Sequence, residues 1–202
     1  NKQNELLLRE IHHRVKNNLQ IINSLLSLQS RKSTNQEVVT MMQESCSRIH
    51  SIALIHNKLY QQQSINRLSI QDYIEQLGEH LLSIYNVGNK QVNLHVDADE
   101  VSLDIDTAIP VGLILTELMT NSLKYAFIDR ESGEIRVQMK HDGGRDYELI
   151  FQDNGVGIPE NKLKQTDSTL GFRLIHSLTR QLAGIIHYTN GALSTYHIRF
   201  KG

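Results

Sequence analysis

The stretch TELMTNSLKYAF, residues 116–127, places three polar side chains of different chemistry in an otherwise apolar pattern. The pattern runs from Asp106 to about Phe127 and predicts one helix. Glu117, Asn121 and Lys124 are spaced four and three residues apart, so they share one helical face. A carboxylate, an amide and an ammonium together suit a hydrated Mg²⁺ with phosphates, because Mg²⁺ prefers oxygen ligands and keeps several waters. Taken alone, the stretch fits a solvated polar helix face better than a magnesium site. The choice between these two interpretations depends on the other segments of the chain.

The segments around this helix predict an α+β domain. EIRVQMKHD (134–142) and DYELIFQD (146–153) flank Gly143-Gly144 and form the clearest β-hairpin of the chain. The other patterned segments are strands near 92–98, 184–189 and 194–200 and helices near 69–85 and 170–182. Helices mixed with mostly hairpin-linked strands predict helices on one face of a largely antiparallel sheet.

A loop with an acidic residue and two glycines follows the second strand of that hairpin, in FQDNGVGIPE (151–160). Gly155 and Gly157 would leave backbone amides free to approach a ligand. An ionised Asp153 only accepts hydrogen bonds, so it suits an exocyclic amine such as adenine N6. The alternative is an ordinary turn, because Asp-Asn-Gly is a common turn sequence.

A third segment, STLGFRLIHSL (168–178), predicts the start of a helix. Ser168 and Thr169 are candidate caps, and Leu170 and Gly171 lie in the first turn. The unpaired N–H groups and positive dipole of a helix N-terminus bind phosphate well. An ordinary helix cap is the alternative.

The N-terminal third of the chain has a different character, because residues 1–62 contain neither glycine nor proline. Apolar residues recur there at three- and four-residue intervals, which predicts amphipathic helix. The polar break RKSTNQE (31–37), with candidate caps at 33–35, divides the segment into a helical hairpin. The hairpin needs a partner surface, either a second copy or a neighbouring domain. We therefore predict two domains, residues 1–64 and 65–202.

Two adjacent histidines stand in the first helix, in REIHHRVKNNLQ (9–20). His12 follows Leu8 by four residues and precedes Val15 by three, so it lies at the edge of the apolar stripe. His13 lies nearly opposite, among polar neighbours only. We expect His12 to pack at the hairpin seam and the His13 ring to face solvent.

The order of these motifs is more specific than any of them. ELMTNSLKYAF, DNGVGIP and TLGFRLI resemble the N, G1 and G2 boxes of the ATP-binding fold shared by gyrase, heat-shock chaperones, mismatch-repair ATPases and histidine kinases, the GHKL (Bergerat) type. The resemblance implies that Asn121 ligates Mg²⁺ with support from Glu117, and that Asp153 reads adenine. It assigns the remaining nucleotide contacts to Lys124, Tyr125, Gly155, Gly157, Thr169, Leu170 and Gly171. The last box, usually Gly-Thr, appears only as LST (193–195), to which we assign no role beyond strand structure.

The N-terminal motif indicates which of these ATPase families the chain resembles most. REIHHRVKNNLQ resembles the phosphoacceptor box of sensor histidine kinases of the HWE-like subfamily, whose box reads H-R-x-K-N. The resemblance implies that His13 is autophosphorylated from ATP–Mg²⁺ and passes its phosphoryl group to an aspartate of a response regulator receiver domain. Glu10, three residues earlier, would accept a proton or hold the tautomer of His13, and Asn17 is the competing orienting group. The resemblance to sensor histidine kinases also implies a homodimer that forms through the helical hairpin.

Composition narrows the remaining possibilities. The chain has 202 residues and a net charge of −1, which gives no reason to expect nucleic-acid binding. A single cysteine, Cys46, and no signal peptide or spanning segment lead us to expect a cytoplasmic location. Because the chain begins at Asn1, we expect a fragment of a longer protein with a sensor domain upstream. Two alternatives remain, a GHKL-type serine kinase acting on a partner protein and a non-catalytic ATP-binding scaffold.

Overall fold

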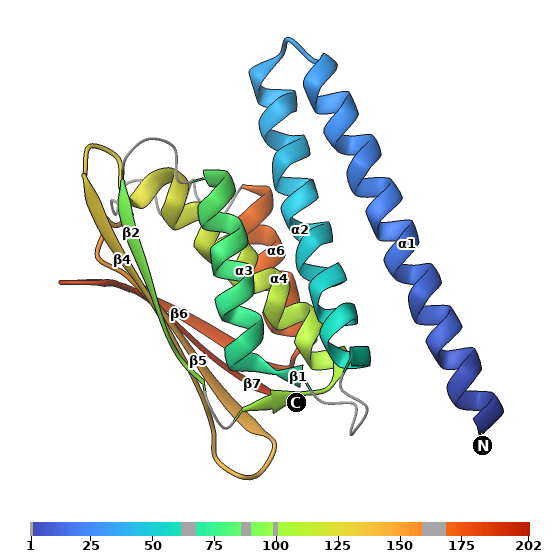
Figure 1. Cartoon of the computed structure of the whole chain (residues 1–202). Helices are drawn as coiled ribbons and strands as arrows, with labels where there is room; N and C mark the ends of the chain where they lie inside the picture. Colours follow the sequence, from blue (N-terminus) through green and yellow to red (C-terminus); the bar gives the residue numbers. More distant parts are fainter. Residues whose placement is uncertain (1, 62–67, 86–89, 99–100, 159–168) are drawn as a thin grey trace.

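A computed structural model places a long helical hairpin beside a sheet that carries helices on one face (Figure 1). It describes residues 2–61, 68–85, 90–98, 101–158 and 169–202. The predicted α+β class and the order of hairpin and sheet domain are confirmed. The predicted boundary between residues 64 and 65 lies outside the described residues.

The hairpin consists of α1 (Lys2–Lys32) and α2 (Gln36–Gln61). The helices separate at the predicted polar break because Asn35 caps α2, and its side-chain oxygen accepts a hydrogen bond from the Glu37 amide at 2.9 Å. Across the described residues no helix combines the length and the apolar character that crossing a membrane requires.

The main sheet has the strand order β2-β4-β5-β7-β6. Its strands are β2 (Gln91–Asp97), β4 (Ser132–His141), β5 (Asp146–Asp153), β6 (Ile185–Asn190) and β7 (Ser194–Lys201). All neighbours pair antiparallel except β2 and β4, which are parallel. A second, two-stranded sheet joins β1 (Leu68–Ser69) and β3 (Ser102–Leu103).

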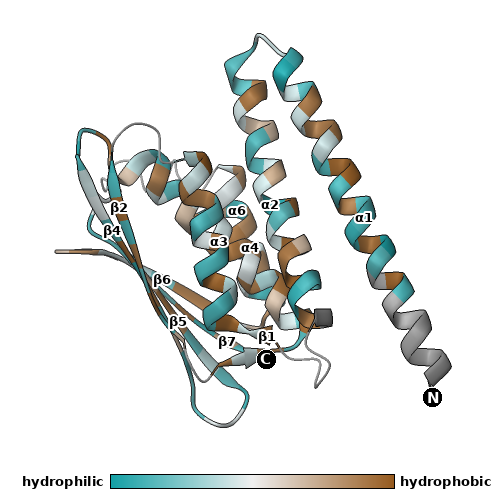
Figure 2. Ribbon diagram, viewed as in Figure 1, coloured by the Kyte–Doolittle hydropathy of each residue, from teal (hydrophilic) through white to brown (hydrophobic). Residues whose placement is uncertain are grey.

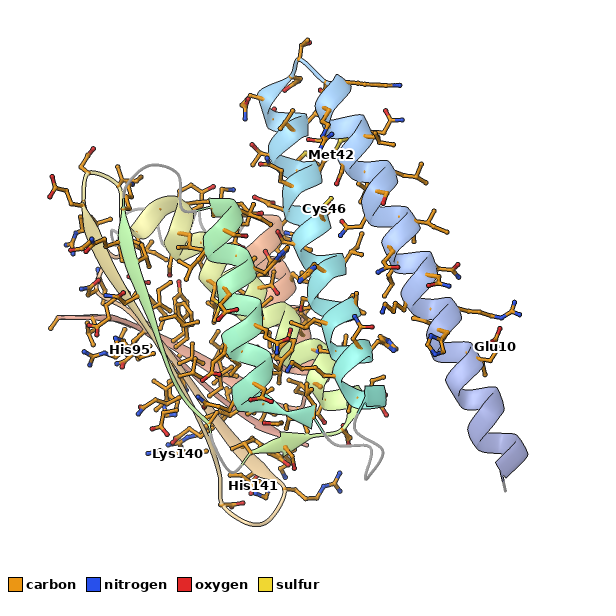
Figure 3. The ribbon with its side chains drawn as sticks, viewed as in Figure 1. Glu10, Met42, Cys46, His95, Lys140 and His141 are labelled. Atoms are coloured by element: carbon orange, nitrogen blue, oxygen red, sulfur yellow. The ribbon has the colours of Figure 1, made fainter. Side chains whose placement is uncertain are left out.

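Three helices cover one face of the main sheet: α3 (Ile70–Tyr85), α4 (Ile105–Asn121) and α6 (Leu170–Gln181) (Figure 1). The opposite face is polar, and His95 and Lys140 point away from the helices there (Figure 3). Strand residues alternate between these faces, as in β5, where every second side chain is buried.

Helix α4 is the central helix of this layer. Asp104 caps it by accepting a hydrogen bond from the Thr107 amide at 2.9 Å. The predicted helix to Phe127 is not one regular α-helix, because residues Ser122–Ala126 form a π-helical turn, η1. A π-helix has more residues per turn, so η1 rotates the side chains beyond Asn121 relative to the α-helical face.

Helix α2 is part of the core of the sheet domain. Ile55 of α2 is fully buried among residues of α3 and α4. A Cβ atom at Gly112 of α4 would lie 2.3 Å from the Tyr73 hydroxyl oxygen and 2.9 Å from Ile55 Cδ1, so the helices meet where only glycine fits. Helix α1 packs mainly on α2, and brown apolar segments recur along the part of α1 that Figure 2 colours. Of the two partner surfaces expected for the hairpin, the sheet domain therefore covers α2. The side of α1 that faces away from α2 stays exposed.

Candidate functional site

A cavity of about 530 Å³ opens between α4, η1, the end of β5 and the start of α6. Most predicted nucleotide residues line it, although they come from three separate segments: Glu117, Asn121, Tyr125, Asp153, Gly157, Thr169, Leu170 and Gly171. Lys124 and Gly155 are not among its lining residues. The fold therefore brings the three sequence motifs together around one space large enough for a small-molecule ligand.

Asp153 is the acceptor at the sheet end of the cavity. It ends β5 with 5% of its surface exposed, and its Oδ2 accepts a hydrogen bond from the Ser122 hydroxyl at 2.8 Å. The Gly155 amide donates to Oδ1 at 2.9 Å. Burial raises the pKa of the Asp153 carboxyl, and the bonds from Ser122 and Gly155 oppose that rise. The site therefore holds an oriented acceptor in a place poor in water.

The two glycines after Asp153 act differently from the prediction that both leave amides free. The Gly155 amide is used by Asp153, and a Cβ atom there would lie 2.4 Å from the Ala126 carbonyl oxygen. Gly155 therefore lets the loop pack on η1. Gly157 lines the cavity with φ +69°, where a Cβ atom would also lie 2.3 Å from Asn190 Oδ1. Its left-handed backbone favours glycine.

The opposite end of the cavity has oxygen donors that fit Mg²⁺ with phosphates. The Asn121 side-chain nitrogen is buried and lacks a hydrogen-bond partner within the part of the chain that the structure describes, so this N–H group can donate to a phosphate oxygen, while the amide oxygen is the atom that could hold Mg²⁺. A Cβ atom at Gly171 would lie 2.7 Å from Glu117 Oε2, so glycine leaves space beside that carboxylate. Thr169 takes the cap position of α6 without a side-chain cap bond, and Leu170 begins the helix. Ser168 lies outside the described residues.

Lys124 does not line the cavity, which corrects the expectation that it contacts the nucleotide there. Its ammonium lies 2.5 Å from a carboxylate oxygen of Glu44 in α2, and it is absent from the cavity lining. Lys124 and Glu117 both face α2, where Glu44 holds the Lys124 ammonium. Burial alone would lower the pKa of Lys124, but its bonds to Glu44 and Tyr125 raise it. The exposed Tyr125 ring lies 5.1 Å from the Lys124 ammonium.

Glu117 also has a partner in α2. Arg48 Nε lies 2.6 Å from Glu117 Oε1, and Arg48 Nη2 lies 3.0 Å from Oε2, which makes a bidentate pair. Arg48 further approaches Glu44 at 3.6 Å. We call Lys124, Glu44, Arg48 and Glu117, in this order, the α2 charge chain. The sequence analysis missed Glu44 and Arg48, because nothing in their local pattern distinguishes them from solvated helix charges.

Ser194 is a third residue at the site that sequence reasoning did not identify, because LST (193–195) received no role beyond strand structure. It lies directly opposite Asp153 in the pairing of β5 with β7, and it lines the cavity. Its buried hydroxyl is near enough to Asp153 to lower the pKa of that carboxyl, although the contact falls short of regular hydrogen-bond geometry. The sequence signal that could have identified Ser194 was LST (193–195), which stands where the last box usually has Gly-Thr.

The candidate phosphoacceptor lies on α1. His13 is exposed, as expected, whereas the side chain of His12 lies outside what the structure describes. Glu10 is exposed and accepts a bond from Arg14 Nε at 2.9 Å, and Asn17 is exposed too. Glu10 points away from α2 and the sheet domain (Figure 3). His13 follows Glu10 by three residues, so helical geometry places it on the same side of α1.

Comparisons with known proteins match both parts of the chain. Residues 10–85 match a family described as histidine kinase, and residues 106–201 match one described as histidine kinase-, DNA gyrase B-, and HSP90-like ATPase. The chain is 30% identical over 194 residues to blue-light-activated histidine kinase 2 of Erythrobacter litoralis, which covers 93% of this chain and 54% of that protein. It is 31% identical over 173 residues to sensor histidine kinase PdtaS of Mycobacterium tuberculosis, covering 85% of this chain and 34% of PdtaS.

A solved structure supports the fold. The histidine kinase domain of the EL346 blue-light-activated histidine kinase from Erythrobacter litoralis superposes with a TM-score of 0.67 at 22% identity. The match covers 90% of this chain and 95% of that domain. The chain thus spans about half of the first curated relative and about a third of the second.

Proposed function

Because this chain belongs to the histidine kinase family, we propose that it is a sensor histidine kinase core that transfers the γ-phosphoryl group of ATP to His13. Residues 65–202 form the ATP-binding domain, and residues 1–64 form the dimerisation and phosphoacceptor domain. The observation that carries the proposal is the single cavity in which the three separate motifs meet.

The nucleotide binds with its adenine at Asp153 and its phosphates toward Asn121 and Gly171. The oriented carboxylate of Asp153 accepts a hydrogen bond from the exocyclic amine, and the N-terminus of α6 faces the negative phosphates. The buried hydroxyl of Ser194 supplies a further polar contact beside Asp153. Asn121 and Glu117 would hold Mg²⁺, which when bound neutralises charge on the phosphates.

His13 is the nucleophile. One imidazole nitrogen attacks the γ-phosphorus, the P–N bond forms as the bond to the leaving oxygen of ADP breaks, and the other nitrogen releases its proton. Glu10 accepts that proton or fixes the tautomer, which requires it to exchange its bond to Arg14. Asn17 is the alternative orienting group. The reaction depends mainly on positioning and charge stabilisation, so an exposed ring that another site can reach suits the role.

Labelling tests the kinase assignment. Incubating the chain with γ-labelled ATP and Mg²⁺ should label His13, and the label should be lost in acid because phosphohistidine is acid-labile. Substitution of His13→Gln should abolish labelling while leaving nucleotide affinity unchanged. An acid-stable label would indicate a serine kinase, and binding without a label would indicate a scaffold.

A second variant tests the role of Asn121. Asn121→Ala should abolish labelling while the circular dichroism spectrum remains that of the original chain. Loss of the folded spectrum would instead show that Asn121 is structural.

The likeness to sensor histidine kinases also supports two partners, a response regulator that receives the phosphoryl group on an aspartate and a second copy of this chain. The exposed apolar residues of α1 support the second copy. Their exposed fractions are 45–58%, and they cover about a third of the helix circumference: Ile11, Ile21, Ile22, Leu25 and Leu28. Pairing with a second hairpin would remove this stripe from water.

Light scattering tests the homodimer. We expect the mass of a dimer for the original chain and of a monomer for Leu25→Glu, with Gln20→Glu on another face of α1 as the matched control. A monomeric original chain would contradict this part of the proposal.

A further inference from the structure

Helix α2 holds Glu117, which the proposed function assigns to Mg²⁺, and also Lys124, which the family resemblance assigns to the nucleotide but which lies outside the cavity lining. Glu117 is held by Arg48 through two hydrogen bonds of 2.6 and 3.0 Å. Lys124 is held by Glu44 at 2.5 Å. Residues 69 and 80 positions apart in sequence thus meet across the boundary between hairpin and sheet domain.

The α2 charge chain is balanced and largely shielded from water. It contains two positive and two negative side chains, of which Glu44 is the most exposed at 24% and Glu117 the least at 7%. Burial alone would lower the pKa of Arg48, yet its hydrogen bonds and attraction to Glu117, together with Glu44, raise it. Removing one member therefore leaves a partner with uncompensated charge in a desolvated place.

The same groups cannot serve a nucleotide fully while α2 holds them. An ammonium bonded to Glu44 does not neutralise a phosphate, and a carboxylate bonded twice to Arg48 competes poorly for a cation. Glu44 itself lines the cavity, so phosphates placed there meet a like charge. Mg²⁺ with the nucleotide's phosphates and the N-terminal part of α2 therefore compete for Glu117, and Lys124 can reach the phosphates only if it leaves Glu44.

The two halves of α2 are anchored differently, which allows partial release. In residues 52–61 of α2 the buried residues are apolar, Ile55 and Leu59. In the preceding part of α2, residues 36–51, the described residues that are buried are Ser47 and Ser51, whose hydroxyls bond to tyrosines of α3 at 3.1 and 2.6 Å. Polar contacts of this kind exchange for water at little net cost, whereas buried apolar side chains resist separation.

We propose that Glu44 and Arg48 form an autoinhibitory latch, in which docking of the N-terminal half of α2 and binding of the nucleotide's phosphates oppose each other. The inference rests on the proposed function, because it needs a nucleotide at this cavity. Helix α1 packs mainly on α2, so release of this half also moves the helix that carries His13. Nucleotide loading and freedom of the phosphoacceptor helix are thereby coupled.

Binding and hydrogen exchange test the latch together. The probe is the β,γ-imido analogue of ATP with Mg²⁺, titrated by calorimetry into the chain, Glu44→Gln, and the control Glu37→Gln, an exposed glutamate in the first turn of α2. Glu44→Gln should bind about fivefold more tightly than the original chain, the effect of one ion pair of moderate strength, and Glu37→Gln should not differ. In the original chain the analogue should speed amide exchange in residues 40–51 and leave 52–59 protected.

The possible outcomes distinguish failure of the latch from failure of the proposed function. Binding by the original chain with equal affinity in Glu44→Gln and unchanged exchange in α2 would overturn the latch and leave the kinase assignment intact. Absence of any binding by the original chain would overturn the proposed function and the latch with it. The exchange measurement needs no variant, so a folding defect in Glu44→Gln would not decide the result.

Discussion

Changing Asp153→Asn should separate recognition of adenine from stability of the fold. The carboxylate is 5% exposed and already accepts bonds from Ser122 and Gly155, so its remaining acceptor capacity faces the cavity. The amide replaces one oxygen by a donor, which meets the donor of the adenine amine. A hydrogen bond to a charged group contributes about 1.5–3 kcal/mol, so affinity for ATP–Mg²⁺ should fall roughly 10- to 150-fold.

The stability of the Asp153→Asn variant should not fall with its affinity for ATP–Mg²⁺. Because burial raises the pKa of Asp153 above its unfolded value, the folded chain holds the proton more tightly, and ionisation destabilises the fold. That cost is fully present above the raised pKa and disappears below the unfolded value of about 3.9. The Asp153→Asn chain should therefore unfold in urea at neutral pH at no lower concentration than the original.

Calorimetry and urea unfolding measure both effects, with Asp146→Asn at the exposed start of the same strand as control. The control should bind like the original chain. Equal affinity for ATP–Mg²⁺ in Asp153→Asn and in the control would refute the assignment of adenine recognition to Asp153. A large loss of stability in Asp153→Asn would refute the argument from burial.

Two further predictions concern the fold around the site. His50 and His80 stack with ring centroids 3.4 Å apart, and burial lowers the pKa of both, that of His80 to about 4, so stability should fall as the pH drops from about 6.5 to 4. His80→Gln should reduce that slope by up to about 1.4 kcal/mol per pH unit in urea titrations, whereas the exposed His187→Gln should not; equal slopes would contradict the burial argument. Gly155→Ala should lower the free energy of unfolding by about 1–3 kcal/mol because its Cβ would lie 2.4 Å from backbone, while Gly191→Ala, with nothing within 4 Å, should change it by less than about 0.5 kcal/mol. Equal stability of these two glycine variants would mean that the loop yields easily.

Much of the site was accessible to sequence reasoning because it is encoded locally. The cap at Asn35, the hairpin at Gly143-Gly144 and the start of α6 each follow from a few neighbouring residues. Helical periodicity alone also predicted that the ring of His13 is exposed. The order of the motifs added the nucleotide residues, since each motif supplies one wall of the cavity.

The sequence by itself determined which segments become helices and strands and which polar groups gather at their ends, because these depend on periodicity and turn chemistry over a few residues. Only the tertiary structure decided which partner each charged side chain at the site binds. Lys124 bonds to Glu44 and Glu117 to Arg48 because α2 packs on α4. Pairings between residues 69 and 80 positions apart depend on packing, and a local pattern cannot encode them.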